Sequence, residues 1–204
     1  MPTKTSTMKK LYVGVLVGGI ILFIWQFLSW SLINLHKPAQ QFTPNQNVVM
    51  NTLNENLEEG GYFMPGLQEG ASMDEYKKLM EDSKGKPWAT IQYHKSNDTN
   101  MAKNMILGVV INIITVWLLC WILSKMNAPT FATVLTASLF TGLIVFFNVP
   151  YTNHIWYQSF DIWAHFIDAI VSWGLCGLWL AWWFSRKQAA TRIKLTKRSQ
   201  DERA

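Results

Sequence analysis

Four long blocks of apolar residues limit what this chain can fold into. They cover residues 11–35, 105–123, 131–149 and 160–184. An α-helix rises about 1.5 Å per residue, so each block is close to or above the roughly 20 residues that a helix needs to cross a bilayer. The sequence therefore predicts an all-α membrane protein, an antiparallel four-helix transmembrane bundle with a small α+β cap between its first two helices.

The predicted boundaries follow from these blocks. The parts are a cytoplasmic N-terminus 1–10, transmembrane helices 11–35, 104–124, 130–149 and 160–184, an extracytoplasmic cap 36–103, an outer loop 150–159 and a basic cytoplasmic tail 185–204. The uncharged stretch of the first block exceeds the usual 7 to 15 residue core of a signal peptide, and no A-x-A pattern follows it, so we expect a retained anchor. Gly14 and Gly18 give this helix a G-x-x-x-G spacing, which favours close packing inside the bundle.

Lysine and arginine residues set the predicted orientation. Residues 150–159 contain neither lysine nor arginine. Outside the cap, the lysines and arginines precede the first block, follow the second block or lie in the tail: Lys4, Lys9, Lys10, Lys125, Arg186, Lys187, Arg192, Lys194, Lys197, Arg198 and Arg203. The positive-inside rule then places both termini in the cytoplasm of a multi-pass plasma-membrane protein, and a bacterial inner membrane fits best. Because topology accounts for the net charge of +5, we expect the lipid bilayer as a partner and no nucleic acid.

Local patterns predict the elements of the cap. Apolar residues recur every four positions from Val49 to Leu57, which favours a short helix. Ser72 and Glu75 have the spacing of a capping box, so we expect a second helix from there to about Asp82. Residues 88–93 alternate in polarity, which is typical of a strand. The cap has no cysteine, so it must fold without disulfides.

The last apolar block carries the strongest functional signal. Asp161, His165, Asp168 and Ser172 fall within about 60° of one another on a helix that turns 100° per residue. An acidic side chain facing lipid near the bilayer centre costs about 2.5 to 3.5 kcal/mol on insertion scales. This face is therefore predicted to point into the bundle or into a wet cavity.

Other polar residues lie at similar depth or in the neighbouring outer loops. Counted from the outer ends of the blocks, these candidate partners gather in the outer half of the bundle: Gln26, Asn112, Asn148, His154 and His36. The inner half is rich in Leu, Gly, Cys and Trp. If the helices surround a pocket, the sequence predicts that it opens outward.

Three interpretations of Asp161, His165 and Asp168 remain open. The first is structural, with Asp161 at the helix start, where the dipole favours a carboxylate, and the other two paired with neighbouring helices. The second is a proton or ion relay, since an imidazole between carboxylates can titrate near neutral pH. The third is a metal site, completed by His154 or His36, although no recognised zinc motif is present. Haem ligation by His36 and His165 is a weaker variant of the third.

These patterns favour a non-enzymatic binding or assembly component with an outward-facing polar cavity. The expected partner is a membrane protein or a small ligand on the outer side, and no cofactor is predicted. An ion- or proton-handling transporter that uses the Asp161, His165 and Asp168 face is the main alternative. An intramembrane metal-dependent enzyme is the third, since a fold alone does not choose among them.

Overall fold

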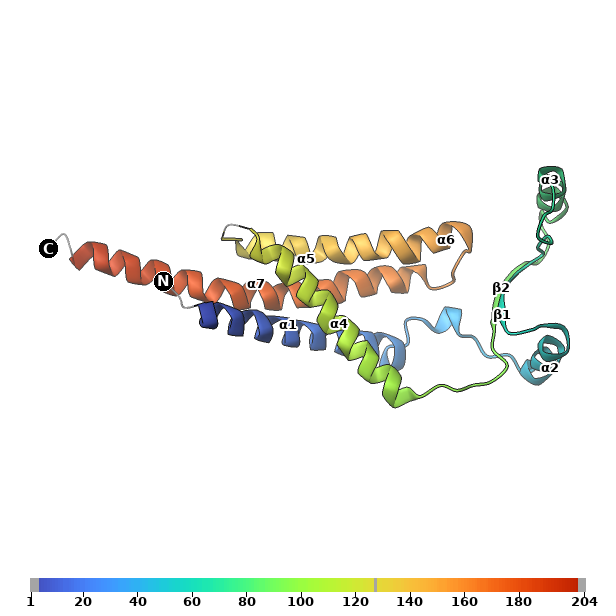
Figure 1. The fold of residues 1–204 in the computed structure, drawn as a ribbon, viewed down its shortest axis with the longest axis horizontal. Helices are drawn as coiled ribbons and strands as arrows, with labels where there is room; N and C mark the ends of the chain where they lie inside the picture. The colour runs from blue at the N-terminus through green and yellow to red at the C-terminus, as the bar shows by residue number, and fades with distance from the viewer. Residues whose placement is uncertain (1–3, 127, 202–204) are drawn as a thin grey trace. The chain divides into compact units, whose positions relative to one another are not determined.

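A computed structural model describes the backbone of residues 4–126 and 128–201 and the side chains of residues 10–126 and 128–185. The chain forms two compact units (Figure 1). One comprises Met1–Gln40 and Asn100–Ala204, and the other is Gln41–Thr99. Most side chains on which the predicted orientation rests, Lys4, Lys9 and those from Arg186 onward, lie outside the described residues.

The first unit is helical. Its elements are α1 Lys4–Phe27, the π-helical turn η1 Leu28–Leu32, the 3₁₀ turn η2 Lys37–Ala39, α4 Met101–Ser124, α5 Phe131–Phe146, the π-helical turn η3 Phe147–Tyr151, α6 Thr152–Trp156 and α7 Ile162–Asp201. Within the described residues, four helical stretches are long and apolar enough to cross a membrane: Lys10–Leu32, Met101–Ser124, Phe131–Trp156 and Ile162–Ser185. The structure is therefore compatible with a multi-pass membrane protein.

The third stretch continues into the segment for which we expected a loop. A proline inside a helix lacks an N–H and its ring crowds the preceding turn. Here Pro150 lies within η3, whose wider turn accommodates the ring, and helix resumes as α6 up to Trp156. Of residues 150–159, only the last three are not helical.

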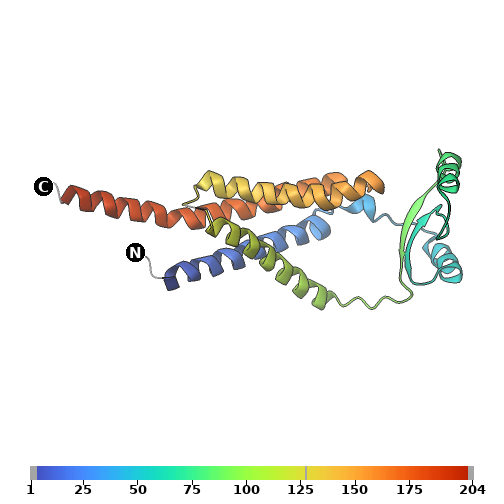
Figure 2. The same ribbon diagram turned by 45° about the horizontal axis from the view of Figure 1, so that its top comes forward.

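The long helices pack mainly through α7. It lies between α5 and α1, and α4 packs across α1 (Figures 1 and 2). Both views show α4 diverging from the other helices toward Met101. We call the end that carries η2 and α6 the His36 end and the opposite end the Lys10 end.

Between its middle and the Lys10 end the buried core is apolar except for Ser138, whose hydroxyl donates to the Val134 carbonyl at 2.9 Å. It contains Val15, Leu22, Val116, Leu119, Cys120, Leu123, Val134, Trp173, Cys176, Leu180 and Ala181. Two indole N–H groups tie α7 to α1 there: Trp179 donates to the Gly14 carbonyl at 3.3 Å and Trp183 to the Lys10 carbonyl at 2.9 Å. These bonds satisfy polar atoms that have no water partner in a bilayer.

Small residues allow the helices to approach closely. A Cβ atom on Gly18 would lie 2.9 Å from Val116 and 3.1 Å from the Cys176 sulfur. The G-x-x-x-G spacing of α1 is therefore used inside the chain, against α4 and α7, as we favoured from the sequence. Gly142 makes the corresponding contact between α5 and α7, where an added Cβ would lie 2.6 Å from the Ala169 carbonyl oxygen.

The second unit combines two helices and a two-stranded sheet. Its elements are α2 Gln46–Asn56, β1 Gly60–Met64, α3 Met73–Asp82 and β2 Ala89–Tyr93. The strands pair antiparallel, with Gly60 opposite Tyr93 and Met64 opposite Ala89. The Tyr93 hydroxyl donates to Asn54 at 2.9 Å and so links the sheet to α2. Both helices and the 88–93 strand predicted for the cap are present.

Gly142 offers a test of the close packing of α5 on α7. We expect Gly142→Ala to lower the free energy of unfolding by about 1 to 3 kcal/mol, because the new methyl group overlaps a backbone oxygen that has no room to move. Gly174→Ala is the matched control, since its Cβ would meet nothing closer than Leu139 at 3.6 Å. Thermal unfolding of both variants in detergent, followed by tryptophan fluorescence, measures the difference. Equal stability of the two variants would contradict the packing.

The capping box of α3 generates a pH-dependent prediction. The Glu75 carboxylate accepts from the Ser72 backbone N–H and hydroxyl, and these two bonds lower its pKa below the usual 4.5. A lowered pKa stabilises the helix above pH 4.5, and this contribution is lost as the pH falls through the lowered value. Hydrogen exchange of the α3 amides should therefore accelerate in that acidic range. Glu75→Gln should flatten the dependence, whereas Glu81→Gln, outside the box, should not.

Candidate functional site

The segment that follows α1 places His36 within the bundle. The π-helical turn η1 closes with the Ile33 N–H donating to the Leu28 carbonyl at 2.8 Å. Asn34 then adopts the left-handed conformation at φ 57°, which asparagine tolerates better than most residues. The helix ends in this turn, in which the Leu35 N–H donates to the Ser29 carbonyl at 2.9 Å, and the His36 side chain that follows is fully buried.

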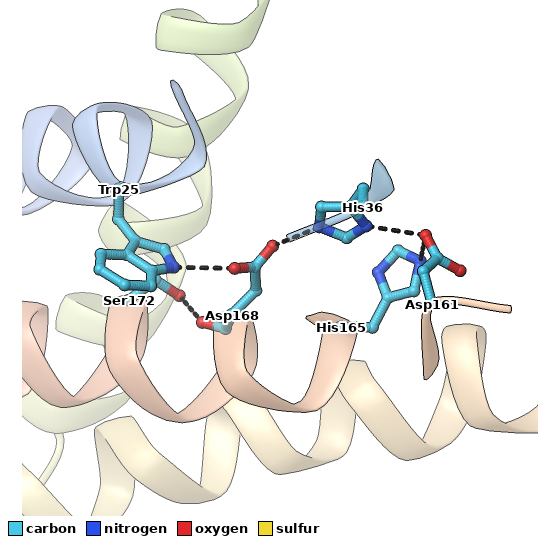
Figure 3. A network of polar contacts seen from close by, with 6 residues as sticks. All are labelled: Trp25, His36, Asp161, His165, Asp168 and Ser172. Carbon is cyan, nitrogen blue, oxygen red and sulfur yellow. Dashed lines mark hydrogen bonds and ion pairs between the residues drawn. The ribbon is translucent and has the colours of Figure 1, made fainter. Parts of the chain in front are cut away.

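His36 bridges the two aspartates of the polar face (Figure 3). Its Nδ1 lies 2.7 Å from Oδ2 of Asp161 and its Nε2 lies 3.0 Å from Oδ2 of Asp168. Asp161 directly precedes α7, and Asp168 lies two turns into it. One imidazole from the loop after α1 thus connects two carboxylates of the last helix.

Two tryptophans, Trp25 of α1 and Trp30 of η1, hold this arrangement. The Trp25 indole N–H donates to Oδ1 of Asp168 at 2.9 Å, so both oxygens of that carboxylate have partners. The Trp30 ring stacks on the His36 ring, with centroids 3.8 Å apart and planes within 7° of parallel. Stacking and the two polar contacts together fix the orientation of the imidazole.

His165 completes the cluster on its more open side. Its Nε2 lies 3.4 Å from Oδ2 of Asp161, and its ring meets the His36 ring edge to face with centroids 4.8 Å apart. The His165 side chain is 32% exposed, whereas that of Asp161 is 5% exposed. We define the His36 cluster as Trp25, Trp30, His36, Asp161, His165 and Asp168.

The hydrogen bonds of His36 imply a net negative charge on His36, Asp161 and Asp168 together. A neutral imidazole has one N–H, and a carboxylate only accepts hydrogen bonds. Hydrogen bonds at both His36 nitrogens therefore require one further proton, either on the ring or on one of its two partner carboxyl groups. In either case His36, Asp161 and Asp168 together have a net charge of −1, since one proton is set against two carboxylates.

The remaining predicted residues lie apart from these contacts. The Ser172 hydroxyl donates to the Asp168 backbone carbonyl at 2.5 Å rather than to its carboxylate. Asn112 donates to Gln26 at 2.8 Å, so these two amides form their own pair between α4 and α1. Asn148 is exposed, and His154 contacts Ser159 at 3.3 Å. Of the five candidate partners, His36 is the one whose side chain the structure places on the two aspartates.

Sequence reasoning overlooked Trp25 and the stacking role of Trp30. The sequence did contain one indication of the Trp25 contact, which is the depth of Trp25 and Asp168 along their helices. Counted from the His36 end, Trp25 and Asp168 both lie about 12 to 15 Å down their helices at 1.5 Å per residue. An indole N–H in an apolar block needs an acceptor. A carboxylate at matching depth on another helix is a natural one.

The geometry limits the chemistry of the cluster. The rings of His36 and His165 are in direct edge contact, which leaves no space for a porphyrin between them, so the haem interpretation is wrong for this conformation. One ligand atom from each of His36, Asp161 and His165 does lie within 4.8 Å of the others, which suits a small ion. The cluster can also hold a proton between its carboxylates.

Replacing His36 tests how much the cluster stabilises the bundle. His36→Leu keeps most of the buried volume but leaves two carboxylates without their shared partner. Removing one member of a buried ionic pair typically costs about 3 to 5 kcal/mol, and we expect a loss of that order. His154→Leu, a half-buried histidine outside the cluster, should change stability far less. Thermal unfolding in detergent compares them, and equal effects would argue against a buried ionic contact.

Comparisons of the chain with protein-family models, curated proteins and solved structures give no match. Function must therefore be inferred from the side chains themselves. Within the described residues, the most informative contact is that of His36 with Asp161 and Asp168.

Proposed function

We propose that the protein is a non-enzymatic, multi-pass membrane protein that binds a small cationic ligand at the His36 cluster. The observation that carries this proposal is the burial of His36 with both ring nitrogens on carboxylates. Burying charged groups is costly unless they are paired. Ionisable residues inside a membrane segment are, by default, candidates for a functional site.

The charge of the cluster favours a cation. His36, Asp161 and Asp168 together carry a net charge of −1, and a bound cation would compensate for it where the surroundings are poorly hydrated. The Coulomb interaction between unit charges 4 Å apart rises from about 1 kcal/mol in water to about 4 kcal/mol at an effective dielectric constant of 20. A cationic ligand is therefore attracted more strongly here than at an exposed acidic surface.

Among the four ionisable members of the cluster, His165 has the most exposed side chain. His165 is about one-third exposed, while His36 is fully buried behind it. Residues 41–99 are joined to the bundle at this same end, through Gln40 and Asn100. By the charge distribution in the sequence this end faces outward, so we propose that the ligand enters from the outside.

Binding accounts for the polar groups better than transport does. A relay across the membrane requires polar groups along the whole path. From Trp25 the buried core continues toward the Lys10 end through apolar side chains, including Val116, Cys176 and Leu180. Those three are completely or almost completely buried. A ligand held at the His36 end therefore has no continuous polar path through the described core, where the buried Ser138 hydroxyl already donates to the Val134 carbonyl.

Flux measurements distinguish a binding protein from the transporter alternative. We expect proteoliposomes containing the protein to dissipate imposed proton, Na⁺ and K⁺ gradients no faster than liposomes without protein. The physical reason is the apolar core below the cluster. Gramicidin-treated liposomes serve as the positive control.

A protein-dependent flux that Asp168→Asn abolishes would contradict the proposal and favour the transporter. Asp98→Asn, in the second unit, is the matched control for loss of an acidic residue outside the cluster. The assembly role predicted from the sequence would appear in the same preparation as a protein that co-purifies from mild detergent in fixed ratio.

A further inference from the structure

The geometry points to a divalent transition metal ion, of the zinc class, as the ligand of the His36 cluster. The proposed ligands are His36 Nδ1, Asp161 Oδ2 and His165 Nε2. Ligand atoms of these three residues lie within 4.8 Å of one another, and Asp161 Oδ2 is 2.7 Å from His36 Nδ1 and 3.4 Å from His165 Nε2. This inference rests on the proposed function, because it specifies the cation.

The chemical types of the three ligand atoms favour one class of metal ion. Two imidazole nitrogens and one carboxylate oxygen suit Zn²⁺ and its first-row neighbours, whereas Mg²⁺ and Ca²⁺ prefer oxygen ligands. Zn–N and Zn–O bonds of about 2.0 to 2.2 Å at tetrahedral angles place ligand atoms about 3.3 Å apart. The observed separations bracket that value. Rotation of the Asp161 and His165 side chains would bring all three atoms onto one ion.

The surroundings of His36 provide a second, independent observation. A histidine that binds a metal through one nitrogen almost always donates its other N–H to a carboxylate, carbonyl or water. His36 Nε2 lies 3.0 Å from the Asp168 carboxylate, which is itself held by the Trp25 indole N–H at 2.9 Å. Asp168 is thus a positioning residue that would leave Nδ1 with a free lone pair directed at the ion.

A divalent metal ion would also neutralise the net negative charge of His36, Asp161 and Asp168. In the metal-free arrangement one extra proton lies among His36, Asp161 and Asp168. A divalent ion would take its place, and its two positive charges would then balance the two carboxylates. The partial exposure of His165 provides an entry side and leaves a fourth coordination position for water.

Elemental analysis tests this inference directly. The purified full-length protein in detergent is equilibrated with ZnCl₂, desalted and analysed for zinc. We expect one zinc per chain, retained on desalting. CoCl₂ in place of zinc should give the visible ligand-field absorption of a tetrahedral or five-coordinate site. MgCl₂ should not compete.

Two histidine variants identify the ligands. His165→Ala should lose both the retained zinc and the cobalt absorption, and because His165 is partly exposed this variant should still fold. Circular dichroism and a monodisperse elution profile check that it does. His94→Ala is the matched control, since His94 is an exposed histidine of the second unit, 3.4 Å from Glu59. It should keep the full stoichiometry.

A third variant separates positioning from ligation. Asp168→Asn should weaken zinc affinity about 10- to 100-fold without lowering the final stoichiometry, as changes around a metal-binding histidine typically do. The cobalt absorption should shift, because the basicity of His36 changes. Asp98→Asn should leave both unchanged.

Three outcomes would overturn the inference. They are no retained zinc in the unmodified protein, equal retention in folded His165→Ala, and loss of zinc only in His94→Ala, which would indicate an adventitious ion at an exposed site. None of these results affects the flux measurement, so a binding protein for a different cation would survive them. Conversely, gradient dissipation that depends on Asp168 would contradict the binding function even if zinc were retained.

Discussion

The contact on which the rest of the structure depends is one imidazole held between two carboxylates at the edge of an apolar bundle. His36 reaches that position through the wide turn that follows α1 and the left-handed backbone of Asn34, which ends the helix. The aspartates in turn require a partner, because the apolar side chains of the bundle would solvate neither of them. This mutual requirement fixes the segment after α1 against the start of α7, and the two residues in contact are 125 positions apart in the sequence.

Buried polar atoms find different kinds of hydrogen-bond partner at the two ends of the bundle. At the Lys10 end the polar atoms are few, and indole N–H groups of α7 donate to backbone carbonyls of α1. Between these contacts, glycines let backbones and small side chains meet. At the His36 end the ionisable groups are concentrated around His36, and the amides of Gln26 and Asn112 pair with each other. An apolar core beneath an ionic cluster suits the retention of a ligand rather than its passage.

The cluster also has the layered arrangement expected of a binding centre. Asp161 and His165 contact His36 on one side, and Asp168, held by the Trp25 indole N–H, contacts its other ring nitrogen (Figure 3). Stacking of Trp30 restricts the imidazole further. Such preorganisation matters because a ligand then need not itself order the side chains that hold it.

The sequence by itself determined the four apolar helices, the capping box of α3 and the face shared by Asp161, His165 and Asp168. These features depend on local composition and on helical periodicity, which the order of residues specifies directly. Only the tertiary structure decided which groups meet that face. His36 was one of five candidate partners, and Trp25 was not among them. Their selection depends on the backbone turn at Asn34 and on which helix neighbours α7, and both are set by packing between residues far apart in the chain.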